Sequence, residues 1–426
     1  MSPVAPSPGR LPSADDVRAA AARLAEVIEP SPLQHHPRLS DLLGLEVWLK
    51  REDLQPVRSY KLRGAYTLIA SLDADQRAAG VTTASAGNHA QGVAFACARA
   101  GVRARVFLPR TTPRQKRDRV AALGGGLVEV VVGGDTYDEA AAASHAFARS
   151  SGATEVPAFD DPRTIAGQGT VALEILDQLD APPDVVVVPV GGGGLLAGAL
   201  AVLPQATRVI AAEPAGAASL AAGLAAGAPV DLPELDGFVD GAAVRRIGGL
   251  PLLAAQQGEP HLLAVPEGLV CVEMLDLYQT DGIIAEPAGA LATAGLRLVG
   301  QPGSPLAIAP GSRVVAILSG GNNDVSRYAE VVERALVHEG LKHYFLVEFP
   351  QEPGALRRFL DEVLGPDDDI TLFEYVKRNN RETGPALVGV ELQDAADLAG
   401  LLRRMEDSPL RVEPVPPESP LFRFVQ

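Results

Sequence analysis

Short apolar segments alternate with longer amphipathic segments from about residue 80 to about residue 335. The apolar segments are rich in Val, Ile and Ala and have the length of buried strands, whereas the segments between them have the length and spacing of helices. The predicted strands are 81–85, 104–109, 128–132, 185–190, 209–213 and 314–319, and the predicted helices are 90–100, 114–123, 136–150 and 164–179. This order predicts an α/β fold with doubly wound, mainly parallel sheets covered by helices on both faces. Ligands of such sheets bind at the carboxyl ends of the strands, so the segments that follow strands are the candidate binding segments.

The pattern changes after Gly340. It then follows the order βαββαβ, with strands at 342–349, 370–377, 386–392 and 410–415 and helices at 354–364 and 395–405. This order is typical of a ferredoxin-like α+β domain. We therefore predict a disordered lead-in at 1–14, a large α/β domain at 15–335, a linker at 336–343 and a small domain at 344–426.

Charge and cysteine content disfavour several classes of protein. The 426 residues carry a net charge of −16, and the pI is near 4.9, which disfavours binding to nucleic acid or to an anionic membrane surface. Two cysteines, Cys97 and Cys271, are too few for a disulfide framework or a cysteine-rich metal cluster. The uncharged run 185–207 is interrupted by Pro189 and four glycines, which disfavours a membrane-spanning helix. We predict a cytoplasmic protein without a metal site and without nucleic-acid or membrane partners.

Lysine is unusually scarce in this chain. Of 37 basic residues only five are lysine, and one of these, Lys61, lies between Arg58 and Arg63. Arginine stays charged and is a poor nucleophile, whereas lysine can lose its proton and form a Schiff base. The position of Lys61 therefore indicates a need for an amine, although five scattered lysines could also reflect chance.

A run of glycines, 191–194, follows the predicted strand 185–190 and precedes a helix. Free backbone N–H groups and the absence of Cβ atoms suit such a loop to binding a phosphate. It is not a Walker loop, because no Gly-Lys-Ser/Thr follows. Glu213 lies near the distance expected of a ribose-binding acid, so a dinucleotide remains an alternative, as does a simple tight turn.

The segment 85–89, Ser-Ala-Gly-Asn-His, also lies between a predicted strand and a predicted helix. Small residues and free N–H groups at the start of a helix suit a carboxylate. The alternative is an ordinary turn in which Asn88 caps the helix.

Taken together, four motifs resemble one known family. They are Ser-Tyr-Lys-Leu-Arg-Gly-Ala at 59–65, Ser-Ala-Gly-Asn-His-Ala-Gln-Gly at 85–92, the four glycines at 191–194 and Ser-Gly-Gly-Asn at 319–322. In this order and spacing they resemble the tryptophan synthase β-subunit-like class of pyridoxal phosphate (PLP) enzymes, and within it the threonine dehydratases, over about residues 15–335. Glu-Pro-Gly-Ala-Leu at 352–356 is similar to the opening of the ACT-like regulatory domain of biosynthetic threonine dehydratases.

The resemblance implies roles for the residues at matching positions. It implies that Lys61 holds PLP as a Schiff base and later removes the Cα proton of the substrate. The other residues that it implies for cofactor binding are Asn88 at the phenolic oxygen, Gly191, Gly192, Gly193, Gly194 and Leu195 at the phosphate, and Ser319 at the pyridine nitrogen. Those implied for the substrate carboxylate are Ser85, Gly87, Asn88 and His89, and Glu286 is implied to lie near the cofactor ring.

The function implied by the resemblance is PLP-dependent β-elimination. It converts L-threonine into 2-oxobutanoate and ammonia, the first step of isoleucine biosynthesis, in a homo-oligomer (tetramer or dimer) that isoleucine inhibits through the ACT-like domain. Because Ser319 is neutral, it need not keep the pyridine nitrogen protonated, which favours prompt loss of a β-hydroxyl over racemisation. The alternatives are a serine dehydratase or a serine racemase of the same family, and a non-enzymatic amino-acid sensor with a degenerate catalytic unit.

Overall fold

The computed structural model describes residues 9–299, 306–375, 382–417, 419 and 421–422. The chain divides into two compact units, residues 1–324 and 325–426. Residues 1–8 of the predicted lead-in lie outside the described residues, and the first helix, α1 (Ala14–Leu24), begins at a capping box formed by Ser13 and Asp16. The domain limits proposed from the sequence, including the linker at 336–343, stay predictions.

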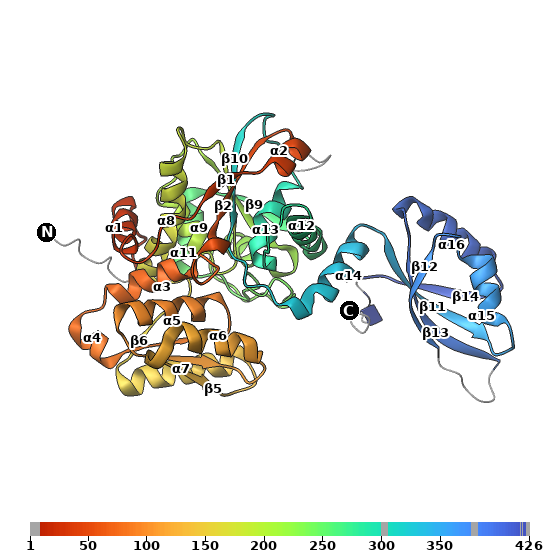
Figure 1. Ribbon diagram of the computed structural model, residues 1–426, viewed down its shortest axis with the longest axis horizontal. Helices are drawn as coiled ribbons and strands as arrows, with labels where there is room; N and C mark the ends of the chain where they lie inside the picture. The colour runs from red at the N-terminus through yellow and green to blue at the C-terminus, as the bar shows by residue number, and fades with distance from the viewer. Residues whose placement is uncertain (1–8, 300–305, 376–381, 418, 420, 423–426) are drawn as a thin grey trace. The chain divides into compact units, whose positions relative to one another are not determined.

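The first unit contains a six-stranded sheet in the order β1-β2-β10-β7-β8-β9 (Figure 1). Its strands are β1 (Leu33–His35), β2 (Glu46–Arg51), β7 (Val185–Pro189), β8 (Arg208–Pro214), β9 (His261–Val265) and β10 (Arg313–Leu318). All neighbours are parallel except β1, which runs antiparallel to β2. Every residue of β7 is buried, as expected for a central strand with helices on both faces. The helices of this region are α2 (Pro37–Leu43), α8 (Pro162–Gln178), α9 (Gly194–Leu200), α10 (Ser219–Ala226), α11 (Gly249–Gly258), α12 (Glu267–Gln279) and α13 (Pro287–Leu296).

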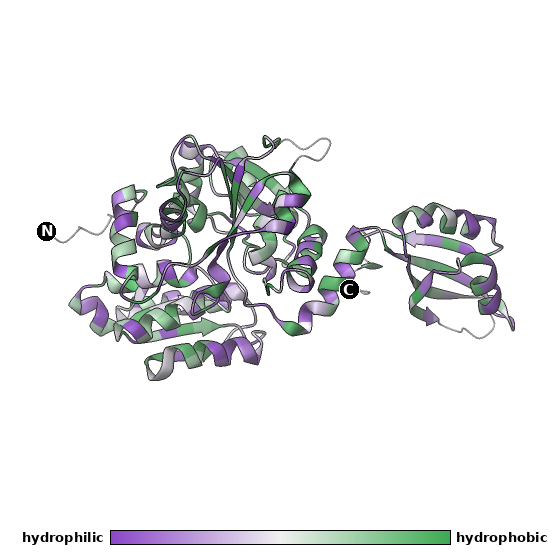
Figure 2. Cartoon of the chain, turned by 45° about the horizontal axis from the view of Figure 1, so that its top comes forward, coloured by the Kyte–Doolittle hydropathy of each residue, from purple (hydrophilic) through white to green (hydrophobic). Residues whose placement is uncertain are grey.

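A second, all-parallel sheet in the same unit has the order β5-β4-β3-β6. Its strands are β3 (Val81–Ala84), β4 (Ala104–Leu108), β5 (Val128–Val132) and β6 (Thr154–Glu155). Its helices are α3 (Lys61–Ala70), α4 (Ala74–Ala79), α5 (Asn88–Ala100), α6 (Arg114–Gly124) and α7 (Tyr137–Ser151). Doubly wound parallel sheets are thus confirmed, and the alternation of strands and helices is divided between two sheets. Apolar residues gather along the buried strands and the inward faces of the helices (Figure 2).

The second unit contains a four-stranded antiparallel sheet in the order β12-β13-β11-β14. Its elements are α14 (Tyr328–His338), β11 (Lys342–Pro350), α15 (Ala355–Arg358), β12 (Asp369–Tyr375), β13 (Thr383–Glu391), α16 (Leu398–Asp407) and β14 (Arg411–Val415). After α14, their order confirms the predicted ferredoxin-like βαββαβ arrangement. The predicted strand 370–377 ends with residues 376–377, which lie outside the described residues. A core that includes Phe345, Phe359, Val388 and Leu401 joins the sheet to its helices.

Among the described residues, no helix is long and apolar enough to cross a membrane. In the same part of the chain, no group of three or more His, Cys, Asp or Glu side chains is arranged to hold a metal ion.

Candidate active site

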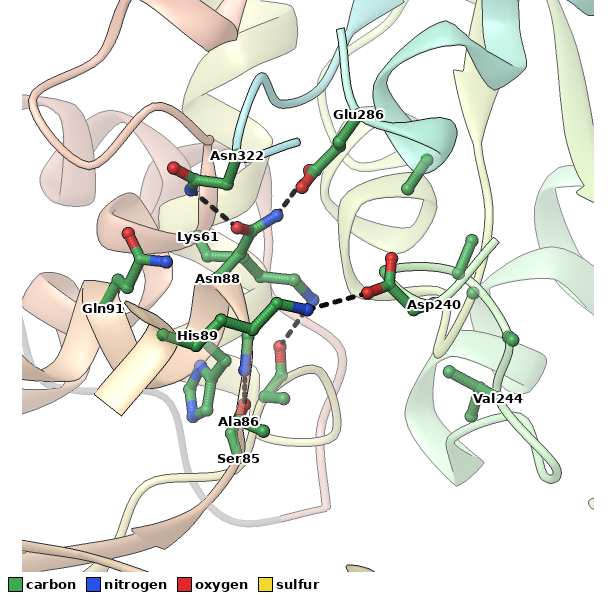
Figure 3. A pocket seen from close by; sticks show the side chains of 18 of the residues that line it. Lys61, Ser85, Ala86, Asn88, His89, Gln91, Asp240, Val244, Glu286 and Asn322 are labelled. Atoms are coloured by element: carbon green, nitrogen blue, oxygen red, sulfur yellow. Dashed lines mark hydrogen bonds and ion pairs between the residues drawn. The ribbon is translucent and has the colours of Figure 1, made fainter. Parts of the chain in front are cut away.

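A cavity of about 1550 Å³ lies in the first unit, where segments from both parallel sheets meet. It is lined by the start of α3, the β3–α5 loop, the loop after β7 and the segment after β10 (Figure 3). The residues predicted for the site that line it are Lys61, Ser85, Gly87, Asn88, His89, Gly191, Gly192, Glu286 and Ser319. Gly193, Gly194 and Leu195 are not among the lining residues, because the chain turns away from the cavity there to begin α9.

Lys61 is the first residue of α3, and its side chain points into the cavity (Figure 3). Its Nζ donates to the carbonyl of Ala158 at 3.4 Å and lies 5.1 Å from the centre of the Tyr60 ring. The long distance to Ala158 indicates a weak hydrogen bond. Among the described residues, the amine therefore has no strong hydrogen-bond partner that a carbonyl ligand would have to displace.

A buried ionic network fixes the helix that carries Lys61. Two residues further along α3, the fully buried Arg63 makes bidentate ion pairs with Glu52 and Glu174, with N–O distances from 2.6 to 2.9 Å. Lys50, also fully buried, donates to Glu174 at 2.7 Å. Burial alone raises the pKa of Glu174, but Arg63 and Lys50 outweigh it and hold that pKa below its ordinary value. The network therefore joins β2, α3 and α8 beneath the cavity through charges that satisfy one another.

The glycine loop closes one side of the cavity tightly. A Cβ atom on Gly192 would lie 2.1 Å from the ring of Phe159, and one on Gly191 would lie 2.8 Å from the Cα of Ala242. Gly193 has a φ of +84°, in the left-handed region that favours glycine. Gly191 and Gly192 line the cavity, so the backbone N–H groups of this part of the loop are the candidate donors to an anion.

The β3–α5 loop offers a second set of donors. Gly87 is the N-cap of α5, Asn88 is its first helical residue, and no side chain caps the helix. The alternative considered from the sequence, an ordinary turn in which Asn88 caps the helix, is therefore not what the structure has. The ring of His89 is buried and its Nε2 lies 2.8 Å from the carbonyl of Val156. Burial and, to a smaller extent, the nearby Lys61 lower the pKa of His89 to about 4, so the ring is neutral at pH 7. The side chain of His89 thus holds the loop in place, and backbone N–H groups remain as the donors for a carboxylate.

The segment after β10 faces these two loops. Ser319 Oγ donates to the carbonyl of Ala288 at 3.0 Å, and a hydroxyl can rotate toward another acceptor. Glu286 accepts from Asn88 Nδ2 at 2.5 Å. Burial and, to a smaller extent, the charge of Asp240 raise the pKa of Glu286 to about 7. Asn322 donates to Asn88 Oδ1 at 2.8 Å. Asn322 belongs to the Ser-Gly-Gly-Asn motif at 319–322, but the resemblance implied no role for it.

Two further features of the cavity were missed from the sequence. Lys116 of α6 and Asp240 both line the cavity and form an ion pair of 3.0 Å. Arg58 lines the cavity with a φ of +55°, which is unusual for a residue with a Cβ and costs about 1–2 kcal/mol. The scarcity of lysine could have drawn attention to Lys116, whereas nothing in the sequence marks the backbone of Arg58.

These residues fit PLP. The amine of Lys61 can form the covalent link, the glycine loop is a cradle in which a Cβ would collide, and Asn88 and Ser319 present neutral polar groups on the walls between them. When bound, PLP supplies an electron sink for negative charge that develops on the substrate.

Comparison with known proteins agrees with this geometry. The sequence profile of the pyridoxal-phosphate dependent enzymes matches residues 24–320, and that of the C-terminal regulatory domain of threonine dehydratase matches residues 333–425. A biosynthetic L-threonine dehydratase of Mycobacterium tuberculosis is 60% identical over 97% of this chain and 96% of its own length. The solved structure of the processed form of threonine deaminase isoform 2 from Solanum lycopersicum is 37% identical, covering 79% of this chain and 99% of that one with a TM-score of 0.69. Maize serine racemase, at 28% identity, covers 77% of this chain and 99% of its own, also with a TM-score of 0.69. This chain therefore belongs to the pyridoxal-phosphate dependent enzymes, and within them to the family of biosynthetic threonine dehydratases.

Proposed function

We propose that this protein is a threonine ammonia-lyase, which converts L-threonine into 2-oxobutanoate and ammonia at the start of isoleucine biosynthesis. The observation that carries the proposal is the convergence of the Lys61 amine, the glycine loop and the β3–α5 loop on one cavity. Similarity over nearly the whole chain to a biosynthetic L-threonine dehydratase supports the same activity.

In this proposal, the cavity residues divide the work of binding and proton transfer. The backbone N–H groups at the start of α5 bind the substrate carboxylate, which places the Cα–H bond toward Lys61. Lys61 Nζ takes the Cα proton, and the β-hydroxyl takes up one proton and leaves as water, so the substrate loses one water molecule in all. Hydrolysis of the released enamine, which takes up one water molecule, then gives 2-oxobutanoate and ammonia. The glycine loop would hold the phosphate of PLP and Ser319 would face its pyridine nitrogen during these steps.

Exchanging lysines for arginine tests the need for an amine at position 61. Lys61→Arg keeps the charge but should abolish the visible absorbance of bound PLP and the release of 2-oxobutanoate. Lys116→Arg is the matched control, because Lys116 lines the same cavity and makes an ion pair that an arginine can keep. It should retain the absorbance. Turnover by Lys61→Arg at the level of the unsubstituted protein would contradict the proposal.

The serine-directed alternatives are separated by substrate. Serine dehydratase activity would release pyruvate from L-serine, and serine racemase activity would form D-serine. We expect kcat/KM to be higher for L-threonine than for L-serine, with little D-serine formed. A higher kcat/KM for L-serine would favour the alternative that the similarity to maize serine racemase keeps open.

We further propose that isoleucine binds the C-terminal unit and inhibits the enzyme. The match of residues 333–425 to a threonine dehydratase regulatory domain supports this. Inhibition requires only that isoleucine bind a less active arrangement more tightly, with coupling of about 1–3 kcal/mol. Deleting residues 341–426 should leave threonine turnover but remove the effect of isoleucine on the half-saturating threonine concentration. Equal inhibition of the truncated and full chains would contradict this site.

The protein is also proposed to be a cytoplasmic homo-oligomer, a tetramer or a dimer. Cys97 and Cys271 are both buried, and two cysteines are too few for the disulfide framework that is common outside reducing compartments. In the sheet of the second unit, β12 and β14 are edge strands, and edges are commonly covered by another subunit. Light scattering coupled to size-exclusion chromatography measures the mass, and a monomer would contradict the proposal.

A further inference from the structure

Asn322 connects three segments of the active site. Its Nδ2 lies 2.8 Å from the backbone carbonyl of Val57 and 2.8 Å from Oδ1 of Asn88. Val57 precedes the turn that leads to Lys61, and Asn88 opens α5, so one amide group reaches the two segments that surround the cofactor-binding lysine (Figure 3). Asn88 in turn donates from Nδ2 to Glu286 at 2.5 Å.

The chemistry of these groups fixes the direction of each amide. A backbone carbonyl can only accept a hydrogen bond, so the contact with Val57 requires that Asn322 present its NH2 group there. The same NH2 group donates to Asn88, which requires that Asn88 present its oxygen to Asn322. The NH2 group of Asn88 must therefore face the opposite side, toward Glu286 and the cavity. One of its two hydrogens serves Glu286, and the second remains for a ligand.

The segment that carries Asn322 is held rigidly enough to impose this direction. The N–H of Gly321 donates to the carbonyl of Arg58 at 2.9 Å, and the N–H of Glu286 donates to the carbonyl of Gly320 at 3.2 Å. A Cβ atom on Gly320 would lie 2.1 Å from Oε1 of Glu286, so the backbone here is in close contact with its neighbours. An amide that is free to rotate would present oxygen or nitrogen with little preference, whereas Asn88 is coupled to a fixed backbone carbonyl.

We propose that Asn322 is a positioning residue that sets the direction of the Asn88 amide, so that Asn88 donates a hydrogen bond to the phenolic oxygen of PLP. The inference rests on the proposed function, because it requires PLP in this cavity with its phenolic oxygen near Asn88. It gives Asn322 a role that is exerted through Asn88.

Substitutions of Asn322 test the proposal through the cofactor itself. Asn322→Asp removes the donor and places a carboxylate next to the oxygen of Asn88, so the new carboxylate competes with Glu286 for the NH2 group of Asn88 and draws that group away from the cofactor. A hydrogen bond to an ionised group stabilises that ionised form, and its loss is equivalent to about a tenfold change in equilibrium. We expect the ratio of visible to near-ultraviolet absorbance of the bound cofactor to fall about tenfold, and the dissociation constant of PLP to rise about as much. Asn322→Ala, which leaves Glu286 to hold the Asn88 amide without Asn322, should give a smaller change in the same direction.

A double-mutant cycle separates action through Asn88 from a general effect on the fold. In the Asn88→Ala background, Asn322→Ala should change neither the absorbance ratio nor the PLP dissociation constant by more than about twofold. Asn323→Ala is the control in the same segment, because its amide oxygen accepts from the N–H of Asp324 and its side chain contacts neither Val57 nor Asn88 through a hydrogen bond within the described residues. We expect it to leave the absorbance ratio unchanged.

Two outcomes overturn the inference. One is an unchanged absorbance ratio in both Asn322 variants while the unsubstituted protein binds PLP. The other is an Asn322→Ala effect that is as large in the Asn88→Ala background as in its absence. If the unsubstituted protein binds no PLP, the proposed function fails as well, and that result is distinguishable because no visible absorbance appears in any variant.

Discussion

Removing the charge of Arg63 should destabilise the first unit more than any surface substitution. Arg63→Met leaves the side chain of Glu52, which is fully buried, without both of its bonds to the guanidinium, whereas Glu174 keeps Lys50 as a partner. Breaking a buried ion pair by removing one partner costs about 3–5 kcal/mol. Because Glu52 loses its direct ion pair and keeps only a hydrogen bond from Ser31 and the more distant charge of Lys50, while Glu174 loses one of its two cations, we expect a loss near the upper end, about 4–5 kcal/mol.

The assay is urea unfolding of the PLP-saturated protein, followed by tryptophan fluorescence. The chain has a single tryptophan, Trp48, which lies in β2 beside the network and reports on this unit. The control is Arg18→Met, which breaks an ion pair with Asp15 whose side chains are 63% and 91% exposed and should cost less than about 1 kcal/mol. Adding Glu52→Gln to Arg63→Met should recover about 2 kcal/mol, because no unpaired charge then remains at that position. A loss below about 1 kcal/mol in Arg63→Met would refute the reasoning.

Three further predictions concern the walls of the cavity. Gly192→Ala should lower stability by about 1–3 kcal/mol and weaken PLP retention, because the added Cβ would lie 2.1 Å from the Phe159 ring. Adding Phe159→Leu should partly restore both, and equilibrium dialysis measures the retention of PLP. The folded-state pKa of Glu286 is raised to about 7, so between pH 4.5 and 7 the folded protein holds a proton that the unfolded chain has lost. The free energy of unfolding therefore falls as pH rises through this range. Glu286→Gln should remove up to about 3 kcal/mol of that fall in urea titrations of the PLP-free protein. The pKa of His89, lowered to about 4, has the opposite sign, so stability is lost as pH falls from about 6.5 toward 4, and His89→Gln should flatten this acid limb; an unchanged limb would contradict the burial of a neutral ring.

The fold could be predicted where apolar residues run without interruption. The predicted strands 185–190, 209–213 and 314–319 correspond to β7, β8 and β10 within one residue at each end, because central strands need buried residues on both faces. The strand β2 was not predicted, because Lys50 and Arg51 look like surface residues in the sequence. Lys50 is buried only because Glu174, 124 residues away, neutralises it. The division into two sheets was also not predicted, since alternation gives the order of the elements along the chain but not which strands are neighbours.

The candidate site could be predicted in its segments but not in its contacts. Its loops lie at the carboxyl ends of strands, where glycine and small polar residues are visible in the sequence. The contacts of Asn322 with Val57 and Asn88 span 265 and 234 residues, and the pair of Lys116 and Asp240 spans 124, so no local pattern marks them. They follow from the way the two sheets meet, which requires the three-dimensional structure.

The central claim is that Lys61 holds PLP. Reduction of the purified protein with borohydride converts a lysine–PLP imine into a stable adduct, and peptide mass spectrometry locates it. We predict the pyridoxyl adduct on the peptide that contains Lys61 and none on the peptides that contain Lys50, which is committed to Glu174, or Lys116, which is paired with Asp240. An adduct on a different lysine, or the absence of any adduct from protein that has been saturated with PLP, would contradict the account.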